Sequence, residues 1–347
     1  KCWSYPLAEI EATDLVSDGS NVFIGADGAM VQALSFEGKK IWSSELGGDI
    51  SSNILPLETG LFLVTSTISG DDDRAGNSML RSLSKETGVT TWTVKLPDAK
   101  RHFLGAFNGA LIVVSRNGII QSIDAKSGKV RWRREIAENF VAAPAFTAEK
   151  VLVASSVKQI FSISLSSGEI ESMRKLSFVV TAIGETPTGE IVAGDERGNI
   201  FSLWSINEKP LWKFKSGGAI SRISTAGTSI LAASHDNFVY YLTARNGDVA
   251  WKKRLSGRNS LLGNIDGRYA LISSFDENNA VIADLASGKV AGVIIFEDEE
   301  TPVSAPATSN GLIFLLTNKA AYAYSLDGCS THKKGGPDII SATANLK

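Results

Sequence analysis

A unit of about 40 residues recurs along this chain, and no other feature of the sequence restricts the possible folds as strongly. Each copy contains short apolar runs separated by turn residues, then a glycine-containing turn, then a position four residues later that is most often tryptophan. The third copy shows this clearly, with Gly128 in the turn and Trp132 after it. The turn positions are 38, 88, 128, 168, 208, 247, 288 and 328. After a first step of 50 residues the spacing stays between 39 and 41, and only Glu208 replaces the glycine, so eight copies fill the chain.

The repeat predicts a β-propeller. The apolar runs are short and are bounded by turn dipeptides such as Asp27-Gly28 and Asn246-Gly247, as in successive hairpins. No segment keeps an apolar period of 3.6 residues, so almost no helix is expected. Four strands in about 40 residues make one propeller blade. We therefore expect an all-β fold, an eight-bladed β-propeller with four antiparallel strands per blade over residues 1–332, followed by a loosely ordered C-terminal tail at 333–347 that packs over one face.

The two ends of the chain are expected to share the last blade. Trp3 lies 39 residues before Trp42, in phase with the repeat, so residues 1–7 read as the outermost strand of a blade. The C-terminal region supplies its other strands, which we predict at 301–308, 312–317 and 320–326. Joining the ends in one blade removes the exposed edges of an open array.

The only two cysteines fall at the same corner of this closing blade. Cys2 and Cys329 are 327 positions apart, yet both lie just after the turn position in the repeat. We predict a structural disulfide between them, which would stabilise the ring by roughly 4–5 kcal/mol in the chain-entropy model and favour an oxidising compartment. Two unrelated thiols are the alternative. A lipid-modified Cys2 is disfavoured, because Lys1 precedes it and Trp3 follows it within a strand.

Tryptophans in phase with the repeat are expected to pack between neighbouring blades. Repeat symmetry distributes them around a circle, so they cannot converge on one aromatic ligand pocket. Ser172, Gly292 and His332 hold the same place in other copies, and Trp204, which is out of phase, is given no role. The blade-packing residues predicted are Trp3, Trp42, Trp92, Trp132, Trp212 and Trp251.

Charge and hydropathy restrict the partners. A net charge of −2 gives no electrostatic reason for nucleic acid or an anionic membrane as the main partner. No apolar run approaches the ~20 residues of a membrane-spanning helix, and the chain enters the repeat directly, without a signal peptide. Basic runs at 129–134 and 252–254 fall on predicted outermost strands, where charges discourage edge pairing. The acidic run 297–300 lies in a connection between blades, as either a solvated loop or part of a docking face.

No catalytic, cofactor-binding or metal-binding residue is predicted. The three histidines lie in different copies without partners at metal-ligand spacing, and His102 and His235 read as ordinary residues near strand ends. Ser234-His235-Asp236 is contiguous, which is the wrong geometry for a proton relay. The expanded loop 69–78 contains three successive aspartates, but neighbouring residues of a hairpin point in different directions, so a solvated loop is expected rather than a cation site.

Residues 123–132 and 243–251 resemble the repeat of the pyrroloquinoline-quinone-like propellers, whose typical form is Leu-Asp-Ala-x-Thr-Gly-x-x-x-Trp. The resemblance extends over residues 1 to 332, although an aspartate precedes the turn glycine by four places only at Asp124 and Asp284. Within this superfamily, an uninterrupted eight-bladed ring is similar to the outer-membrane β-barrel assembly lipoprotein B family. That likeness implies a periplasmic scaffold that docks on the central barrel-assembly protein of Gram-negative bacteria.

Quinone-dependent dehydrogenases of the same superfamily have longer chains with insertions, an adjacent-cysteine disulfide and a calcium ion. Here the cysteines lie at opposite ends, and seven of the eight repeats leave no room for insertions. We therefore expect a non-catalytic, monomeric, protein-binding scaffold without a cofactor. The expected compartment is periplasmic or otherwise extracytoplasmic, with outer-membrane association through a removed N-terminal anchor. A pyrroloquinoline-quinone-dependent or other oxidoreductase and a carbohydrate- or peptide-binding propeller are the alternatives.

Overall fold

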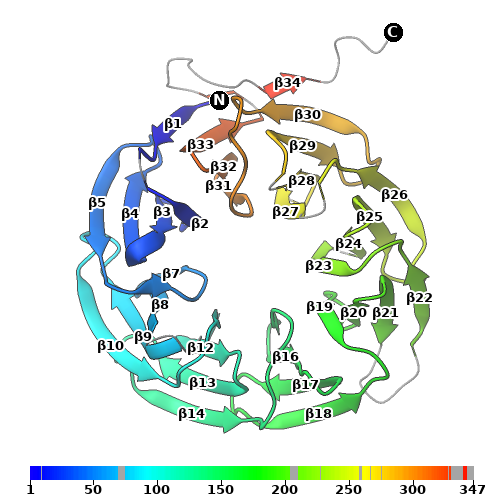
Figure 1. Cartoon of the computed structure of the whole chain (residues 1–347), viewed down its shortest axis with the longest axis horizontal. Helices are drawn as coiled ribbons and strands as arrows, with labels where there is room; N and C mark the ends of the chain where they lie inside the picture. The colour runs from blue at the N-terminus through cyan, green and yellow to red at the C-terminus, as the bar shows by residue number, and fades with distance from the viewer. Residues whose placement is uncertain are drawn as a thin grey trace.

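The computed structural model is a ring of eight β-sheets arranged around a central axis (Figure 1). It describes all residues except 9, 69–74, 204–209, 227, 258–259, 266, 275, 327, 330–338 and 342–347. Each sheet is one blade, and we number the blades 1 to 8 in chain order from β2. The predicted eight-bladed propeller of antiparallel strands is confirmed.

The first four blades occupy the N-terminal half of the chain. Blade 1 contains β2 (Ala12–Ser17), β3 (Asn21–Ala26), the 3-10 turn η1 (Asp27–Ala29), β4 (Met30–Ser35) and β5 (Lys40–Glu45). Blade 2 contains β6 (Asp49–Ile50), β7 (Leu55–Leu57), β8 (Gly60–Ile68), β9 (Ala75–Leu83) and β10 (Thr90–Leu96). Blade 3 contains β11 (His102–Phe107), β12 (Ala110–Ser115), β13 (Ile119–Asp124) and β14 (Val130–Glu135). Blade 4 contains β15 (Ala145–Phe146), β16 (Lys150–Ala154), β17 (Gln159–Ser164) and β18 (Ile170–Lys175).

The other four blades complete the ring. Blade 5 contains β19 (Val180–Glu185), β20 (Ile191–Asp195), β21 (Asn199–Leu203) and β22 (Trp212–Lys215). Blade 6 contains β23 (Ile220–Ala226), β24 (Ser229–Ser234), β25 (Phe238–Thr243) and β26 (Val249–Arg254). Blade 7 contains β27 (Ser260–Ile265), β28 (Tyr269–Ser274), β29 (Asn279–Asp284), β30 (Val290–Ile295) and β34 (Ile339–Ser341). Blade 8 contains β31 (Ala307–Ser309), β32 (Leu312–Leu316), β33 (Ala320–Ser325) and β1 (Trp3–Pro6).

Burial differs systematically between the strands of a blade. In blade 3, every residue of β12 is buried, whereas β14 alternates between exposed and half-buried positions. The middle strands are therefore nearly continuous apolar runs, because both of their faces pack against other blades. The hydrophobic clusters lie between adjacent blades; one of them joins Ile112 and Ile120 of blade 3 to Val151 and Phe161 of blade 4. The core is thus a series of inter-blade layers around the ring.

The N-terminal strand closes the last blade, as predicted. β1 pairs antiparallel with β33, with Trp3 opposite Ala323, and it is the outermost strand of blade 8. The predicted first strand at 301–308 is wrong in extent, since β31 begins only at Ala307 and an isolated bridge joins Pro302 to Thr317. Pro302 and Pro306 lack backbone N–H groups, which prevents a longer ladder.

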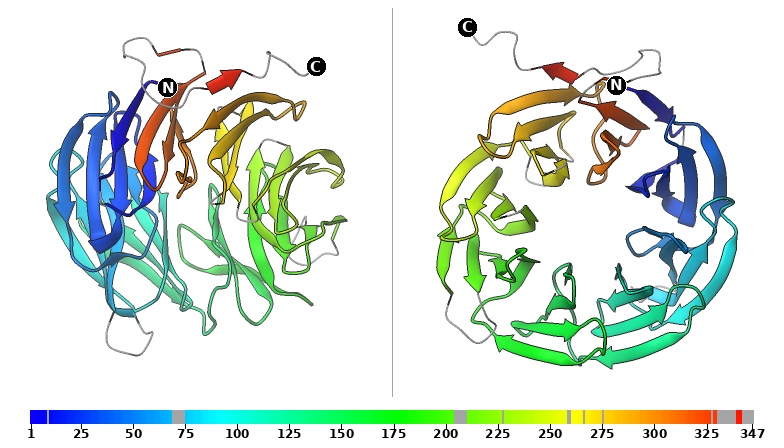
Figure 2. Two further views of the ribbon diagram at one scale, coloured as in Figure 1. Left: turned by 45° about the horizontal axis from the view of Figure 1, so that its top comes forward. Right: turned by 180° about the vertical axis from the view of Figure 1, so that it is seen from behind.

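Part of the C-terminal segment pairs with the outside of blade 7. β34 runs antiparallel to β30, with Ile340 opposite Val293, and Figure 2 shows it along the outer rim. Most of the expected tail, 330–338 and 342–347, lies outside the described residues. The described residues contain no helix with the length and apolar character that crossing a membrane requires.

Candidate functional site

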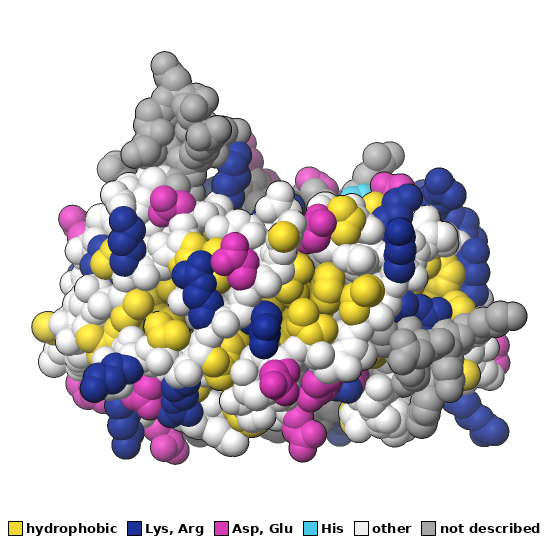
Figure 3. All heavy atoms as spheres, turned by 90° about the horizontal axis from the view of Figure 1, so that it is seen from below, with side chains coloured by type: hydrophobic (Ala, Val, Ile, Leu, Met, Phe, Trp, Pro, Cys, Tyr) yellow, Lys and Arg dark blue, Asp and Glu magenta, His cyan; other side chains and the backbone are white. Residues whose placement is uncertain are grey.

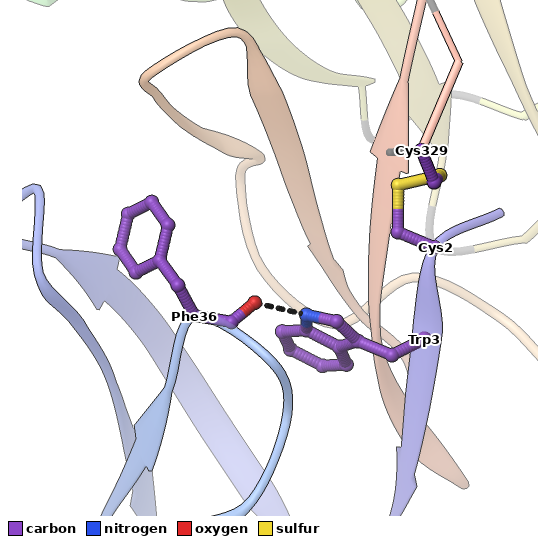
Figure 4. Close-up of a disulfide and its surroundings, with 4 residues drawn as sticks. All are labelled: Cys2, Trp3, Phe36 and Cys329. Carbon is purple, nitrogen blue, oxygen red and sulfur yellow. Dashed lines mark hydrogen bonds between the residues drawn. A yellow bond between two sulfur atoms is a disulfide. The ribbon is translucent and has the colours of Figure 1, made fainter. Parts of the chain in front are cut away.

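Each of six in-phase tryptophans links its own blade to the following blade. Every indole Nε1 donates a hydrogen bond to a backbone carbonyl in the turn between the third and fourth strands of the following blade. The contact from blade 8 to blade 1 is shown in Figure 4, where Trp3 donates to Phe36 O at 2.6 Å. The other contacts join Trp42 to Lys85, Trp92 to Ala125, Trp132 to Leu165, Trp212 to Ala244, and Trp251 to Leu285.

The turn glycine is the second partner of each tryptophan. A Cβ added to Gly168 would lie 2.4 Å from the Trp132 ring, and one added to Gly247 would lie 2.4 Å from Trp212. Both glycines also have positive φ, so the turn needs glycine for two independent reasons. Sequence reasoning found the turn but missed this contact. One feature of the sequence does indicate this contact. Ser172 replaces tryptophan in the fourth copy, and Glu208, which lies outside the described residues, replaces glycine in the fifth copy.

The two cysteines meet at the corner of blade 8. Cys2, immediately before β1, is bonded to Cys329, which follows β33, and their Cα atoms are 5.3 Å apart (Figure 4). The cystine thus joins the N-terminal strand covalently to the C-terminal part of the same blade. The two linked segments are 327 residues apart in the sequence, and the bond makes both of them parts of blade 8.

One face of the ring carries the blade-to-blade connections together with the turns between the second and third strands; we call it the connection face. Half-buried and buried carboxylates tie these two kinds of loop to each other. In blade 6, Asp236 accepts hydrogen bonds from Gly217 N at 2.7 Å and from the Tyr240 hydroxyl at 2.6 Å. Burial alone would raise the pKa of Asp236, but the hydrogen bonds from Tyr240 and Gly217 outweigh it and lower the pKa. Ser234, His235 and Asp236 therefore form a structural turn rather than a relay.

Glu277 and Glu300 repeat this arrangement in blades 7 and 8. Glu277 accepts hydrogen bonds from the backbone N–H and the hydroxyl of Ser256. Glu300 is only 1% exposed and accepts from Thr317 Oγ1 at 2.5 Å and from the Tyr322 hydroxyl at 2.7 Å. Burial and the Glu300 carboxylate together raise the pKa of Tyr322. The acidic run 297–300 is thus divided, with three exposed side chains carried on a loop that buried Glu300 holds in place.

A cavity of about 690 Å³ lies at the centre of the ring. Its lining comes from inner strands and connections on both sides of the axis, so the cavity opens among the loops of the connection face. The charged lining residues are Asp14, Asp27, Asp49, Arg101 and Arg222.

The charged lining residues of this cavity come from several blades. Asp14 and Asp27 belong to blade 1, whereas Arg101 precedes blade 3 and Arg222 belongs to blade 6. Burial raises the pKa of Asp14, although the backbone N–H groups of Ile54 and Leu15 and the nearby Arg101 oppose the shift. The Arg222 side chain is exposed to the cavity, yet the surrounding protein lowers the pKa of its guanidinium, and no described residue forms an ion pair with it. Such a polar lining suits hydrogen bonding to another molecule.

The two described histidines, His102 and His235, do not come together in one site. His102 is fully buried, its Nδ1 lies 3.0 Å from Ser115 Oγ, and burial lowers the pKa of its imidazole to about 4. His235 is exposed in a turn, and His332 lies outside the described residues. Among the residues that the structure describes, no group of three or more His, Cys, Asp or Glu side chains could hold a metal ion. The three aspartates of the loop 69–78 also lie outside those residues.

The fold and its repeat define the chain as an eight-bladed propeller of the pyrroloquinoline-quinone-like repeat class. A family model described as outer membrane protein assembly factor BamB matches residues 1–100 and 76–328, and the chain belongs to this family. One curated relative, the outer membrane protein assembly factor BamB of Yersinia pestis, is 22% identical over 313 residues, covering 80% of this chain and 76% of that protein.

Solved structures share the fold at low sequence identity. BamB from Moraxella catarrhalis matches with a TM-score of 0.69 and 16% identity, over 95% of this chain and 98% of that one. The computationally designed Ika8 protein gives 0.75 and 11%, over 92% and 97%. The C-terminal WD40 domain of Sif2 gives 0.69 and 12%, over 92% and 98%. These likenesses show the eight-bladed architecture.

Proposed function

We propose that this chain is a non-catalytic, protein-binding scaffold that acts as an extracytoplasmic accessory factor in the assembly of outer-membrane β-barrel proteins. The observation that carries the proposal is the family match over nearly the whole ring. The relative from Yersinia pestis is named as an assembly factor, and we extend that role to this chain.

The connection face supports a scaffolding role. Its loops are held by the carboxylates of half-buried Asp236 and buried Glu300, so they present side chains with little freedom to lose on binding. Loops on a rigid framework are common sites of protein recognition. We propose that the partner docks here, around the opening that Arg101 and Arg222 line.

Co-purification tests this proposal. A tagged copy of the chain, expressed in a Gram-negative host, is expected to retain the central barrel-assembly protein of the outer membrane. Arg101→Ala combined with Arg222→Ala should reduce the amount retained at least tenfold. Lys126→Ala combined with Lys129→Ala, at an exposed turn on the opposite face, is the matched control and should leave it unchanged.

Two results would contradict the proposal. Failure of the wild-type chain to retain that protein would remove the assembly role. Dye-linked oxidation of a substrate after addition of pyrroloquinoline quinone and calcium would replace the scaffold with the oxidoreductase alternative. Equal losses in both double variants would instead show that the partner does not dock on the connection face.

A further inference from the structure

The outer wall of the ring is not uniformly charged. Seen from the side of β14 and β18, it carries a band of hydrophobic side chains with both basic and acidic residues around it (Figure 3). On this side, exposed acidic side chains partly offset the positive charge of the exposed basic side chains. Arg133 lies 3.5 Å from Glu135 in β14, and β18 exposes Glu171 as well as Lys175.

The adjacent blades 5 and 6 differ from every other part of this wall. β22 exposes Lys213 and Lys215, and β26 exposes Lys252 and Arg254, while neither strand contains an acidic residue. Each of these two strands therefore contributes two exposed positive charges. The other outermost strands expose a net charge of at most one, because an exposed acid accompanies the base or few charges are present. We call the four cations of β22 and β26 the basic wall.

No described acidic side chain neutralises the charges of the basic wall. None of the four cations forms an ion pair with a described residue. Lys213 Nζ lies 5.3 Å from the centre of the Phe201 ring, and Lys252 Nζ lies 4.9 Å from that of Phe238. Lys215 donates to a backbone carbonyl, that of Arg197. These contacts position the side chains and leave their positive charge available to an outside partner.

Exposed aliphatic side chains accompany the basic wall. Leu211, just before β22, is 55% exposed, and Val249, the first residue of β26, is 42% exposed. Both precede the in-phase tryptophan of their blade and so lie at the same end of the wall, next to the turns. Lys and Arg beside exposed aliphatic groups are typical of surfaces that bind at the interface of an anionic bilayer.

We propose that the basic wall is a binding surface for an anionic membrane. The occupant follows from shape and charge: none of these residues lines the central cavity or the cavity of about 340 Å³ at Phe146 and Glu185, so the basic wall is an open surface outside both described cavities. Four separate cations on an open surface suit mobile, anionic lipid headgroups. The choice of a membrane as the partner rests on the proposed function, which places the chain next to the outer membrane. The unequal charge of the outer wall is an observation that does not depend on that function.

Vesicle co-sedimentation tests the proposal with the full chain. Vesicles of phosphatidylethanolamine and phosphatidylglycerol at 7:3 should pellet the protein at low salt at least fivefold more than phosphatidylcholine vesicles, and ~0.3 M salt should abolish the difference. Substitution of Lys213, Lys215, Lys252 and Arg254 by Gln should lower the binding at least tenfold. Substitution of four exposed lysines elsewhere by Gln changes the net charge equally and should preserve it; this control changes Lys39, Lys40, Lys126 and Lys129.

Equal pelleting of the two quadruple variants, or no preference of the wild type for anionic vesicles, would overturn the proposal. Binding of poly-L-glutamate that needs the basic wall, without vesicle binding, would assign the wall to an acidic protein and also overturn it. Since this measurement contains no assembly protein, its failure is distinguishable from failure of the co-purification experiment.

Discussion

At the scale of single residues, the contact between tryptophan and turn glycine explains most of the repeat signature. The glycine provides a backbone conformation with positive φ, and it also leaves room for the indole ring of the preceding blade. The indole N–H then finds an acceptor in the same turn, which satisfies its only donor in a half-buried position. Conformation, packing and hydrogen bonding thus meet in one short segment of six of the eight copies.

Gly168→Ala separates the steric part of this contact from the conformational part. We expect it to lower the free energy of unfolding by about 3 kcal/mol, because the new methyl group would overlap the Trp132 ring and the φ of +73° also disfavours alanine. Gly28→Ala is the matched control, with a φ of +67° and nothing within 4 Å, and should cost about 1 kcal/mol. Urea denaturation gives both values. Equal losses would show that the Trp132 ring moves aside without lowering the free energy of unfolding.

Buried His102 makes stability depend on pH. The pKa of its imidazole is about 4 in the folded protein and near 6.5 when unfolded, so the unfolded chain binds more protons between these values. The contribution is fully present above pH ~6.5 and is lost as the pH falls towards 4, amounting to about 2–3 kcal/mol. His102→Gln should flatten this part of the curve when urea denaturation is repeated from pH 7 to 4.5. An unchanged slope would show that His102 does not titrate as its burial implies.

At the scale of strands and blades, the period of the sequence was sufficient to predict the number of blades and the closure of the last blade by the N-terminal strand. The apolar alternation and the turn dipeptides are local signals, and most strands pair with their neighbours in sequence. The first strand of blade 8 was misplaced because its pattern is interrupted by Pro302 and Pro306. The pairing of β34 with β30 could not be predicted, since it lies outside the repeat and depends on contact between distant segments.

The candidate site was far less predictable than the fold. Asp14 and Arg222 are in different copies, at positions where no motif marks them, and only closure of the ring brings them to one cavity. The buried role of Glu300 was hidden within an acidic run that could equally be solvated. The unequal charge of the outer wall could not be predicted either, because it depends on which residues of each outermost strand face water. Side chains that come together only because the ring closes do not produce a periodic pattern in the sequence.

The hydrogen bond of an inter-blade tryptophan can be measured at this scale. Trp132→Phe keeps most of the ring volume but removes the donor to Leu165 O, and should cost about 1 kcal/mol. Trp132→Ala also opens a cavity between blades 3 and 4 and should cost about 3–5 kcal/mol. Chemical denaturation of both variants provides the comparison. Equal costs would assign the whole contribution to the polar contact and none to packing.

At the scale of the whole molecule, closure makes the ring different from a linear array of repeats. Blade 8 combines residues from both ends of the chain, and Trp3 extends the tryptophan contacts across the seam to blade 1. No such contact leaves Gly292 of blade 7 or Ser172 of blade 4, so two of the eight interfaces lack it. Because every blade has two neighbours, we propose that residues 1–332 unfold as one cooperative unit.

The disulfide at the seam provides the test of closure. Cys2→Ser with Cys329→Ser should lower the free energy of unfolding by roughly 6 kcal/mol in the chain-entropy model, because the unfolded chain is then no longer a closed loop of 327 residues. This is somewhat more than the roughly 4–5 kcal/mol expected from the sequence. The β1–β33 pairing and the Trp3 contact remain, so the ring should still form, and its far-ultraviolet circular dichroism should be unchanged. Reduction of the wild type should give the same stability as the double variant, and a thiol assay on the denatured, unreduced protein should detect no free thiol. Two free thiols in that assay would rule out the bond. A double variant as stable as the wild type would instead mean that strand pairing alone holds the seam, and that the cystine only limits the rate at which β1 leaves blade 8.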